Sequence, residues 1–219
     1  MNKDSRQDER PEPDSPTTGV SKPVRTAVEN YRYRIFLHQP FGERIRSFWW
    51  AVTWQMIFRW TPRRFIAWRC LLLRLFGARI GHGCFVAPSV YIVFPWNLSL
   101  ADGVVVEHKA IMNCMGKIYI GVGARISQHA HLCTETHDYV RSDMRTRSSS
   151  ISIGSDVWIA ADAFVGPGVS IGNGSVLAAR SSAFKDLPAH QVCVGEPARP
   201  LKPRDSASNR SDRMARVSS

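Results

Sequence analysis

Cysteine is scarce in this sequence, and its five cysteines form no CxxC pair. The odd count and scattered positions are typical of structural thiols rather than of a disulfide framework. We therefore expect a cytoplasmic protein in which these residues are reduced: Cys70, Cys84, Cys114, Cys133 and Cys193.

Aliphatic side chains are almost absent from residues 1–30, which are charged and rich in proline. Such a segment cannot bury enough apolar surface to offset the entropy lost on ordering, so we expect a disordered tail. Its composition also differs from that of a signal peptide, which argues against export. Residues 203–219 are similarly polar, and we expect a second disordered tail there.

Acidic residues are outnumbered, with 18 Asp and Glu against 29 Lys and Arg, which gives a net charge of +11. The excess is unevenly placed, because arginine dominates residues 25–79 while residues 153–184 carry little net charge. Such asymmetry indicates an anionic partner, which could be a membrane surface, nucleic acid or a phosphorylated ligand.

The stretch Ile153–Phe184 repeats with a period of six residues. Each recurring aliphatic residue is followed by glycine or alanine, and a small or β-branched residue stands four places after it. The aliphatic positions are Ile153, Ile159, Val165, Ile171 and Leu177. This period fits neither a helix nor a simple strand, whereas hexapeptide repeats are typical of a parallel β-helix.

The residue types suit such a coil. The aliphatic side chain stacks inside a narrow prism, and the glycine or alanine beside it lets the chain turn where a larger Cβ would clash. The small residue fills the remaining interior without overpacking. Five consecutive matches argue against a chance run in a sandwich rich in glycine and alanine.

The repeat extends back to Ile80 with two short slips, and we assign the β-helix domain to residues 79–202. At roughly 18 residues per coil, Ile80 to Ala183 makes about six coils and a prism on the order of 30 Å tall. The fold class is therefore mainly β.

One interruption is longer than the others. The repeat is lost from His137 to Ser150 and returns at Ile151. Because loops longer than about 12 residues in a compact fold are usually functional or disordered, we expect loop 138–150 to leave the prism. His137 borders this loop, which indicates an active site there.

Residues 31–78 precede the β-helix as an amphipathic helical segment. Apolar residues from Phe41 to Met56 follow helical spacing, Thr61-Pro62 is expected to start a second helix, and Gly77 to end it. The uncharged run Ser47–Phe58 is too short to span a bilayer, which needs about 20 apolar residues.

Two compatible roles remain open for this segment. Its helices can cap the open end of the β-helix and shield its edge. Its interleaved tryptophans and arginines can also make peripheral membrane contact through residues 41–76. Nucleic acid is not expected as a partner, because no recognition motif is present.

Four stretches resemble the hexapeptide-repeat acyltransferases, in particular the sugar O-acetyltransferases of the colanic-acid-biosynthesis type. They are WRCLLLRLFGARIG (68–81), ISQHAHLCTETHDY (126–139), VWIAADAFVGPGVSIG (157–172) and VGEPARPLK (194–202). The resemblance covers about residues 40–202. It implies a left-handed β-helix and a homotrimer, with acetyl-CoA held between neighbouring prisms.

The resemblance also implies roles for three residues near the acceptor. His137 matches the catalytic histidine, and imidazole suits a general base because it titrates near neutral pH. Asn113 matches an asparagine that binds the acceptor or orients the histidine, although an asparagine at a corner of the coil would be explained equally well by its conformational tolerance. Trp158 matches a tryptophan beside the site. No GxSxG or Cys–His signature suggests a covalent intermediate, so we expect direct transfer.

Four further positions match the family's contacts with acetyl-CoA. They are the backbone amide of Ala161 near the thioester, Ala179 beside the pantetheine arm, and the cations Lys185 and Arg199 near the phosphates. The chain departs from the family at Arg180, commonly glycine, and at Phe184, commonly threonine.

A metal is not expected. The γ-class carbonic anhydrases share this fold and bind zinc through three histidines, but the spacing of His129, His131 and His137 does not match theirs. The function we expect is acetyl-CoA-dependent O-acetylation of a sugar in a surface polysaccharide or glycan precursor. An acceptor that is an antibiotic, amine or amino acid, and a scaffold without catalysis, are the alternatives. We expect a cytoplasmic location, with peripheral contact at the inner face of the membrane as an open addition.

Overall fold

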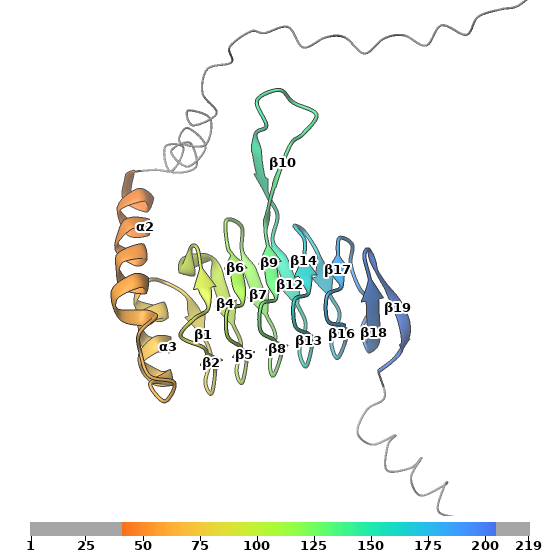
Figure 1. Ribbon diagram of the computed structural model, residues 1–219, viewed down its shortest axis with the longest axis horizontal. Helices are drawn as coiled ribbons and strands as arrows, with labels where there is room; N and C mark the ends of the chain where they lie inside the picture. The colour runs from red at the N-terminus through yellow and green to blue at the C-terminus, as the bar shows by residue number, and fades with distance from the viewer. Residues whose placement is uncertain (1–40, 205–219) are drawn as a thin grey trace, which may run out of the picture. The chain divides into compact units, whose positions relative to one another are not determined.

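The computed structural model describes residues 41–204. Successive short strands turn around a prism with three parallel sheets as its faces (Figure 1). Sheet A has the order β1(Arg79–Ile80), β4(Leu98–Leu100), β7(Ile118–Ile120), β12(Ile151–Ile153), β15(Ser170–Ile171). Sheet C has the order β17(Ser182–Ala183), β14(Phe164–Val165), β9(His131–Cys133), β6(Ile111–Asn113), β3(Tyr91–Ile92).

Sheet B is the third face, and the C-terminal hairpin extends it. Its strands in chain order are β2(Phe85–Val86), β5(Val105–Val106), β8(Arg125–Ile126), β13(Trp158–Ile159), β16(Val176–Leu177), β18(Gln191–Gly195) and β19(Ala198–Pro203). All neighbours are parallel except β18 and β19. The expected left-handed parallel β-helix is confirmed. β19 runs one residue into the segment expected as a tail.

The six-residue repeat fixes the register of the coils. In sheet A the aliphatic residues pair in a continuous column: Ile80, Leu100, Ile120, Ile153 and Ile171. Equivalent columns run through sheets B and C, and these residues are buried throughout. The small residues between them are buried too, including the hydroxyl residues Ser175 and Ser181. The core is therefore one stack of side chains along the prism.

The helical segment consists of α2(Phe41–Thr53), a π-helical turn η1(Trp54–Phe58) and α3(Ile66–Leu75). The second helix was expected to begin at Thr61-Pro62, but it begins at Ile66. The Thr61 hydroxyl donates to the Phe58 carbonyl and accepts a hydrogen bond from Arg69. It therefore stabilises the turn after η1 and does not serve as the N-cap of α3. Gly77 ends α3 as expected, with a φ of +90°.

The helices cap all three sheets at the first coil. The indole N–H groups of Trp50 and Trp54 donate to carbonyls of Ile92 and Val90, at the β3 edge of sheet C. Arg69 donates to Val86 at the β2 edge of sheet B. Arg74 donates to Ile80 at the β1 edge of sheet A. Because unpaired edge carbonyls invite pairing with other chains, this capping protects the open end.

Candidate active site

The expected loop 138–150 is the outer part of a β-hairpin. Strand β10(Glu135–His137) pairs antiparallel with β11(Thr146–Ser148), and His137 lies opposite Thr146. The hairpin leaves the prism after β9 of sheet C and returns before β12 of sheet A (Figure 1). The hexad pattern could not predict β11, because its residues are polar and fully outside the core.

A buried threonine fastens the hairpin to the prism. Thr134 is fully buried, and its hydroxyl donates to the Asn113 carbonyl at 2.7 Å and accepts from the Gly116 N–H at 2.8 Å. The N–H of Ser149, on the returning arm, donates to the Thr134 carbonyl at 2.9 Å. These bonds hold both arms against the preceding coil, so the base of the hairpin is fixed.

The His137 side chain folds back onto its own hairpin. Its Nδ1 lies 2.9 Å from the carbonyl oxygen of Met144. A carbonyl can only accept a hydrogen bond, so this geometry assigns the proton of the neutral ring to Nδ1. In that tautomer Nε2 carries the lone pair and is the atom that can take a proton.

Ion pairs stiffen the end of the hairpin. Arg147 contacts Asp138 at 2.6 Å, and Arg141 contacts Asp143 at 3.0 Å. The hydrogen bond from Arg141 lowers the pKa of the exposed Asp143 carboxyl. Beyond these pairs Tyr139 is strongly exposed, with 84% of its surface accessible. The hairpin thus presents an aromatic side chain to solvent near its tip.

Asn113 lies one coil before the hairpin, where it pairs with Cys133. Its Nδ2 lies 3.5 Å from both the Cys133 thiol and Oε2 of Glu135, which is the long limit of a hydrogen bond. The other carboxylate oxygen of Glu135, Oε1, is buried and has no hydrogen-bond partner within residues 41–204. A buried oxygen of this kind favours a donor from outside the chain.

Sequence reasoning missed both Glu135 and Thr134. The signal for Glu135 was the period of two in a strand, which puts residues 135 and 137 on one face. That signal was hidden because residues from His137 onward were interpreted as a loop. No comparable signal marked Thr134, since its role depends on the coil below.

His131 lies on β9, and its role is structural. Its ring packs edge-on against Phe164, with centroids 5.4 Å apart, and burial lowers its pKa. Phe164 in turn contacts Phe184 at 5.6 Å. Within the described part of the chain, no three His, Cys, Asp or Glu side chains gather as a metal site requires. A mechanism without metal stays a prediction.

The residues expected to bind the donor lie mainly on and beside sheet B. Trp158 projects from β13, is about half exposed, and donates from Nε1 to the Ser127 hydroxyl at 2.9 Å. Ala161 lies in the turn after β13, and Ala179 lies in the equivalent turn one coil later, after β16. A hydrogen bond from the Arg180 N–H to the Ala161 carbonyl joins the two turns. Neither alanine N–H donates a hydrogen bond within residues 41–204.

The two expected cations occupy different faces. Lys185 follows β17 of sheet C, two coils beyond the hairpin, and Arg199 lies on β19 of sheet B. Both are exposed, and neither forms a salt bridge with a described residue.

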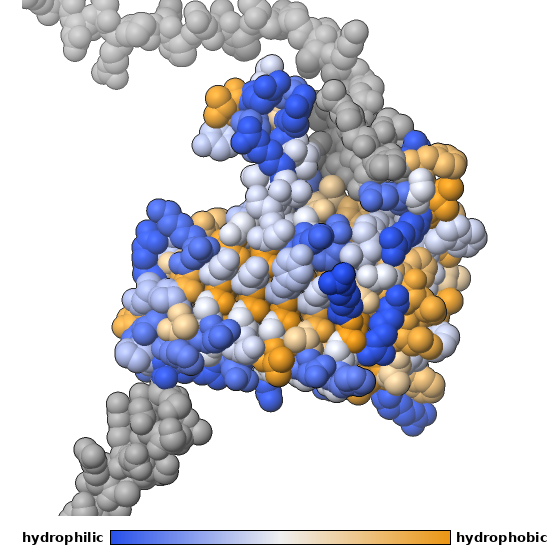
Figure 2. Space-filling model, turned by 180° about the vertical axis from the view of Figure 1, so that it is seen from behind, coloured by the Kyte–Doolittle hydropathy of each residue, from blue (hydrophilic) through white to orange (hydrophobic). Residues whose placement is uncertain are grey.

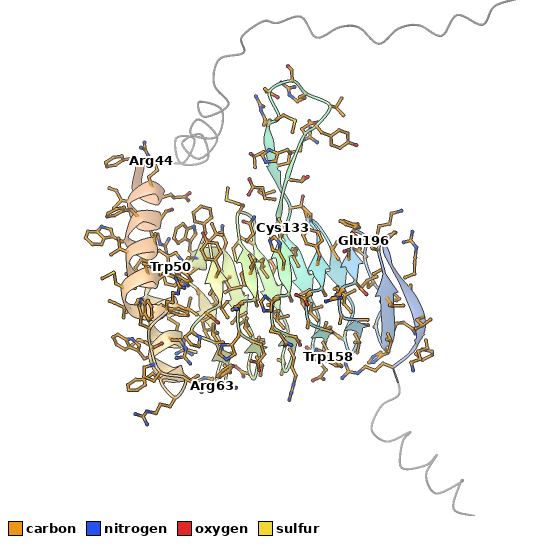
Figure 3. All side chains as sticks on the ribbon, in the orientation of Figure 1. Arg44, Trp50, Arg63, Cys133, Trp158 and Glu196 are labelled. Carbon is orange, nitrogen blue, oxygen red and sulfur yellow. The ribbon has the colours of Figure 1, made fainter. Side chains whose placement is uncertain are left out.

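A single chain does not bring all the expected residues together. Cys133, at the base of the hairpin, and Trp158 lie on opposite sides of the prism (Figure 3). His137, Asn113 and Glu135 cluster where sheet C ends, whereas Trp158, Ala161 and Ala179 cluster along sheet B.

Comparison with known proteins identifies the family. The family model described as bacterial transferase hexapeptide (six repeats) matches residues 150–182. The chain is 47% identical over 150 residues to a protein of Escherichia coli (strain K12) named for colanic acid biosynthesis, the acetyltransferase WcaF, covering 68% of this chain and 82% of that relative. It is 28% identical over 134 residues to the galactoside O-acetyltransferase of the same organism, covering 60% of this chain and 66% of that relative.

Solved structures agree with the sequence comparison. A hexapeptide-repeat acetyltransferase from Vibrio cholerae, complexed with acetyl coenzyme A, superposes with a TM-score of 0.69 and 27% identity over 76% of this chain and 91% of that chain. A galactoside acetyltransferase in complex with coenzyme A has a TM-score of 0.65 at 23% identity, over 78% and 87% of the two chains, and shows the same fold. The chain therefore belongs to the hexapeptide-repeat acyltransferases, with the colanic-acid-biosynthesis type among its relatives.

Proposed function

We propose that this acyltransferase moves the acetyl group of acetyl-CoA onto a hydroxyl of a sugar in a surface polysaccharide or glycan precursor. Relatives named for colanic acid biosynthesis and galactoside acetylation support a sugar acceptor, and an acetyl-CoA complex among the similar structures supports the donor. The observation that carries the proposal is the placement of His137 on an ordered hairpin, with Nδ1 held by the Met144 carbonyl.

His137 acts as the general base in this proposal. Nε2 takes the proton of the acceptor hydroxyl while the hydroxyl oxygen bonds to the thioester carbonyl carbon. A tetrahedral oxyanion forms, and the carbon–sulfur bond then breaks with its electron pair leaving on sulfur. The imidazolium returns its proton to the thiolate, so the products are an acetyl ester and the CoA thiol.

The bond from Nδ1 to Met144 supports this role in two ways. It selects the tautomer with a basic Nε2, and it stabilises the imidazolium formed during the reaction because a carbonyl oxygen faces the added charge. Asn113 and Glu135 lie at the hairpin base and bind acceptor hydroxyls in this proposal, with Glu135 Oε1 as an unsatisfied acceptor.

The donor is held by the sheet B residues. The N–H of Ala161 stabilises the thioester oxyanion, and the N–H of Ala179 binds the pantetheine arm; both groups lack partners within residues 41–204. Trp158 lines the site beside them. The exposed cations Lys185 and Arg199 bind CoA phosphates. The amide of Ala161 does this work whatever its side chain, so the alanine suits the role.

A homotrimer completes the site in this proposal. The proposed base lies beyond the end of sheet C, whereas Trp158, Ala161, Ala179 and Arg199 lie on and beside sheet B, and a neighbouring copy supplies the second half. Each site would then combine the hairpin of one subunit with sheet B of another.

Among the described residues, no helix is long and apolar enough to cross a bilayer. We propose a cytoplasmic enzyme that contacts the membrane peripherally through residues 41–76, where a lipid-linked sugar acceptor would be found.

Replacement of the base tests the mechanism. His137→Ala should lower kcat by roughly 10²–10⁴-fold, measured as release of CoA thiol, while acetyl-CoA binding and the oligomer persist. His82→Ala, on the first coil and away from the hairpin, is the matched control and should keep full activity. Activity near wild type in His137→Ala would overturn the assignment.

The acceptor is tested with the same thiol assay on a panel of compounds. Sugars and polyprenyl-linked sugars should support turnover, while antibiotics, amines and amino acids should not. Turnover only with a compound of the second group would refute the sugar acceptor and leave the acyl-transfer mechanism intact.

A further inference from the structure

The outer face of the helical segment is apolar although its inner face already packs on the prism. The buried stripe consists of Trp50 and Phe58, with Trp54 partly buried beside them. A helix turns by about 100° per residue, which places a second group of residues on the side opposite the buried stripe. Five large apolar side chains are exposed there: Ile45, Phe48, Trp49, Val52 and Met56. A helix that is apolar on both faces requires a second apolar surface.

This exposed face continues across the turn into α3. Trp60 is 71% exposed, Leu75 is 71% exposed, and Phe65 and Trp68 are also exposed. A shallow groove of about 450 Å³ joins the two parts, lined by Met56, Ile57, Trp60, Thr61, Pro62, Phe65 and Trp68. Figure 2 shows apolar surface gathered at this helical end of the molecule. Contiguous exposed apolar patches of this kind mark interaction surfaces.

The charge on this face is of one sign. Between Ile45 and Ala78 the chain has no acidic residue and six arginines, of which Arg59, Arg63 and Arg64 are exposed at the turn. Arg59 lies 5.6 Å from the ring centre of Trp60, and Arg64 lies 5.9 Å from that of Phe65. Cations beside exposed aromatic rings match the level of lipid headgroups, where phosphate meets the acyl region.

The turn that carries these residues is held rigidly. Arg69 is fully buried and donates to the carbonyls of Pro62 and Arg63 as well as to the Thr61 hydroxyl. The side chains of Trp60, Arg63 and Arg64 therefore project from a fixed backbone, so the loop itself loses little entropy on docking.

We propose that this outer face docks on an anionic lipid bilayer, with the apolar side chains entering the interface and Arg59, Arg63 and Arg64 binding lipid phosphates. A second copy of the chain fits less well, because a symmetric contact would place arginines against arginines with no acidic partner. The inference rests on the peripheral contact in the proposed function and specifies its residues and its lipid chemistry.

Vesicle binding of the full-length protein tests this inference. Wild type should sediment with vesicles of phosphatidylcholine and phosphatidylglycerol at low salt, bind pure phosphatidylcholine far more weakly, and lose binding in high salt. A triple variant, Arg59→Gln, Arg63→Gln and Arg64→Gln, should lower partitioning by about ten- to a hundred-fold. The control triple variant Lys117→Gln, Arg125→Gln and Lys202→Gln removes the same charge elsewhere and should bind as wild type does.

A second variant separates insertion from simple charge attraction. Trp49→Ser with Trp60→Ser should lose binding although its charge is unchanged, whereas Val122→Ser, an exposed apolar residue on the prism, should not. No binding by wild type, or equal losses in both charge triples, would overturn the proposal. So would a smaller oligomer in the tryptophan variant, measured by light scattering, because the face would then be a protein interface.

Acetyl transfer to a soluble sugar, measured in parallel without vesicles, keeps the two proposals distinguishable. Binding to vesicles without turnover of any soluble or polyprenyl-linked sugar would leave the docking intact and refute the catalytic proposal. Turnover without vesicle binding would refute the docking and leave the catalytic proposal intact.

Discussion

At the scale of single residues, the hairpin presents two polar side chains on one face. Glu135 and His137 are two apart on β10, and side chains two apart in a strand share a face. Thr136 between them is exposed on the other face. Oε1 of Glu135 has no hydrogen-bond partner within residues 41–204, so on the face that also carries the proposed base it could accept a hydrogen bond from an acceptor hydroxyl.

Glu135→Gln should therefore weaken acceptor binding. We expect KM for the sugar to rise by roughly tenfold, the equivalent of one charge-assisted hydrogen bond, with KM for acetyl-CoA unchanged. Steady-state kinetics with each substrate varied in turn measures this split. Thr136→Ala is the control on the opposite face, and an equal effect in both variants would indicate only a disturbed strand.

His131 gives a residue-scale prediction about pH. Burial lowers its pKa in the folded protein below the ordinary value of 6.5. Below that value the unfolded chain binds a proton that the folded chain does not, so stability falls as pH decreases. His131→Phe keeps an aromatic contact with Phe164 and removes the titration. Its Tm should drop less than that of wild type between pH 7.5 and 5.5, and parallel losses would contradict this reasoning.

At the scale of elements, the coils were predictable and the additions to them were not. Every coil repeats one physical requirement, an inward aliphatic residue beside a small residue at a turn, so the sequence carries the pattern in nearly every hexad. The hairpin lacked such a pattern, because β10 and β11 are held by main-chain bonds and exposed ion pairs such as Arg147 with Asp138. Residues 1–40 and 205–219 lie outside the described residues, so the expected tail 1–30, the start of the helical segment at 31–40 and the tail beyond residue 204 stay predictions.

The start of α3 was misplaced for a related reason. Thr61-Pro62 has the composition of a helix start, but Arg69, eight residues later, takes the Thr61 hydroxyl and the nearby carbonyls. A single sequence does not reveal that an arginine is buried. The hydrogen bonds of Arg69 form only when α3 packs on the first coil.

Arg69 consequently supports the whole helical cap. Arg69→Met should lower the free energy of unfolding by about 2–4 kcal/mol, since it leaves the Val86 carbonyl and the turn carbonyls without donors. Chemical denaturation measures this loss. Arg64→Met, at an exposed arginine on the same turn, should change stability little. If the two variants were equally stable, the capping role would be wrong.

At the scale of the whole molecule, the prism separates three tasks along and around its axis. The first coil is closed by helices whose outer face is apolar and basic. The hairpin with His137 leaves the middle coils where sheet C ends, and most of the residues expected to bind the donor follow sheet B toward the C-terminus. A rigid stack of coils suits this division, because each coil contacts only its neighbours and the faces keep a fixed orientation.

This separation also limits what sequence could predict of the site. The resemblance supplied the individual residues His137, Asn113, Trp158, Ala161, Ala179, Lys185 and Arg199. It did not show that hairpin and donor residues lie on different faces of one chain. The face on which a residue lies depends on which of the three strands of its coil it belongs to. This in turn depends on the register between strands far apart in the sequence.

The most direct test of the account is complementation between two inactive variants. His137→Ala lacks the base, and Ala179→Trp fills the exposed turn expected to bind pantetheine. Each variant alone should be inactive. After the two are dissociated, mixed equally and reassembled, the proposed trimers should place an intact hairpin beside an intact donor face in roughly a quarter of the sites. Recovery of about that fraction of wild-type turnover is the predicted result, and a mixture that stays inactive would contradict a site shared between subunits.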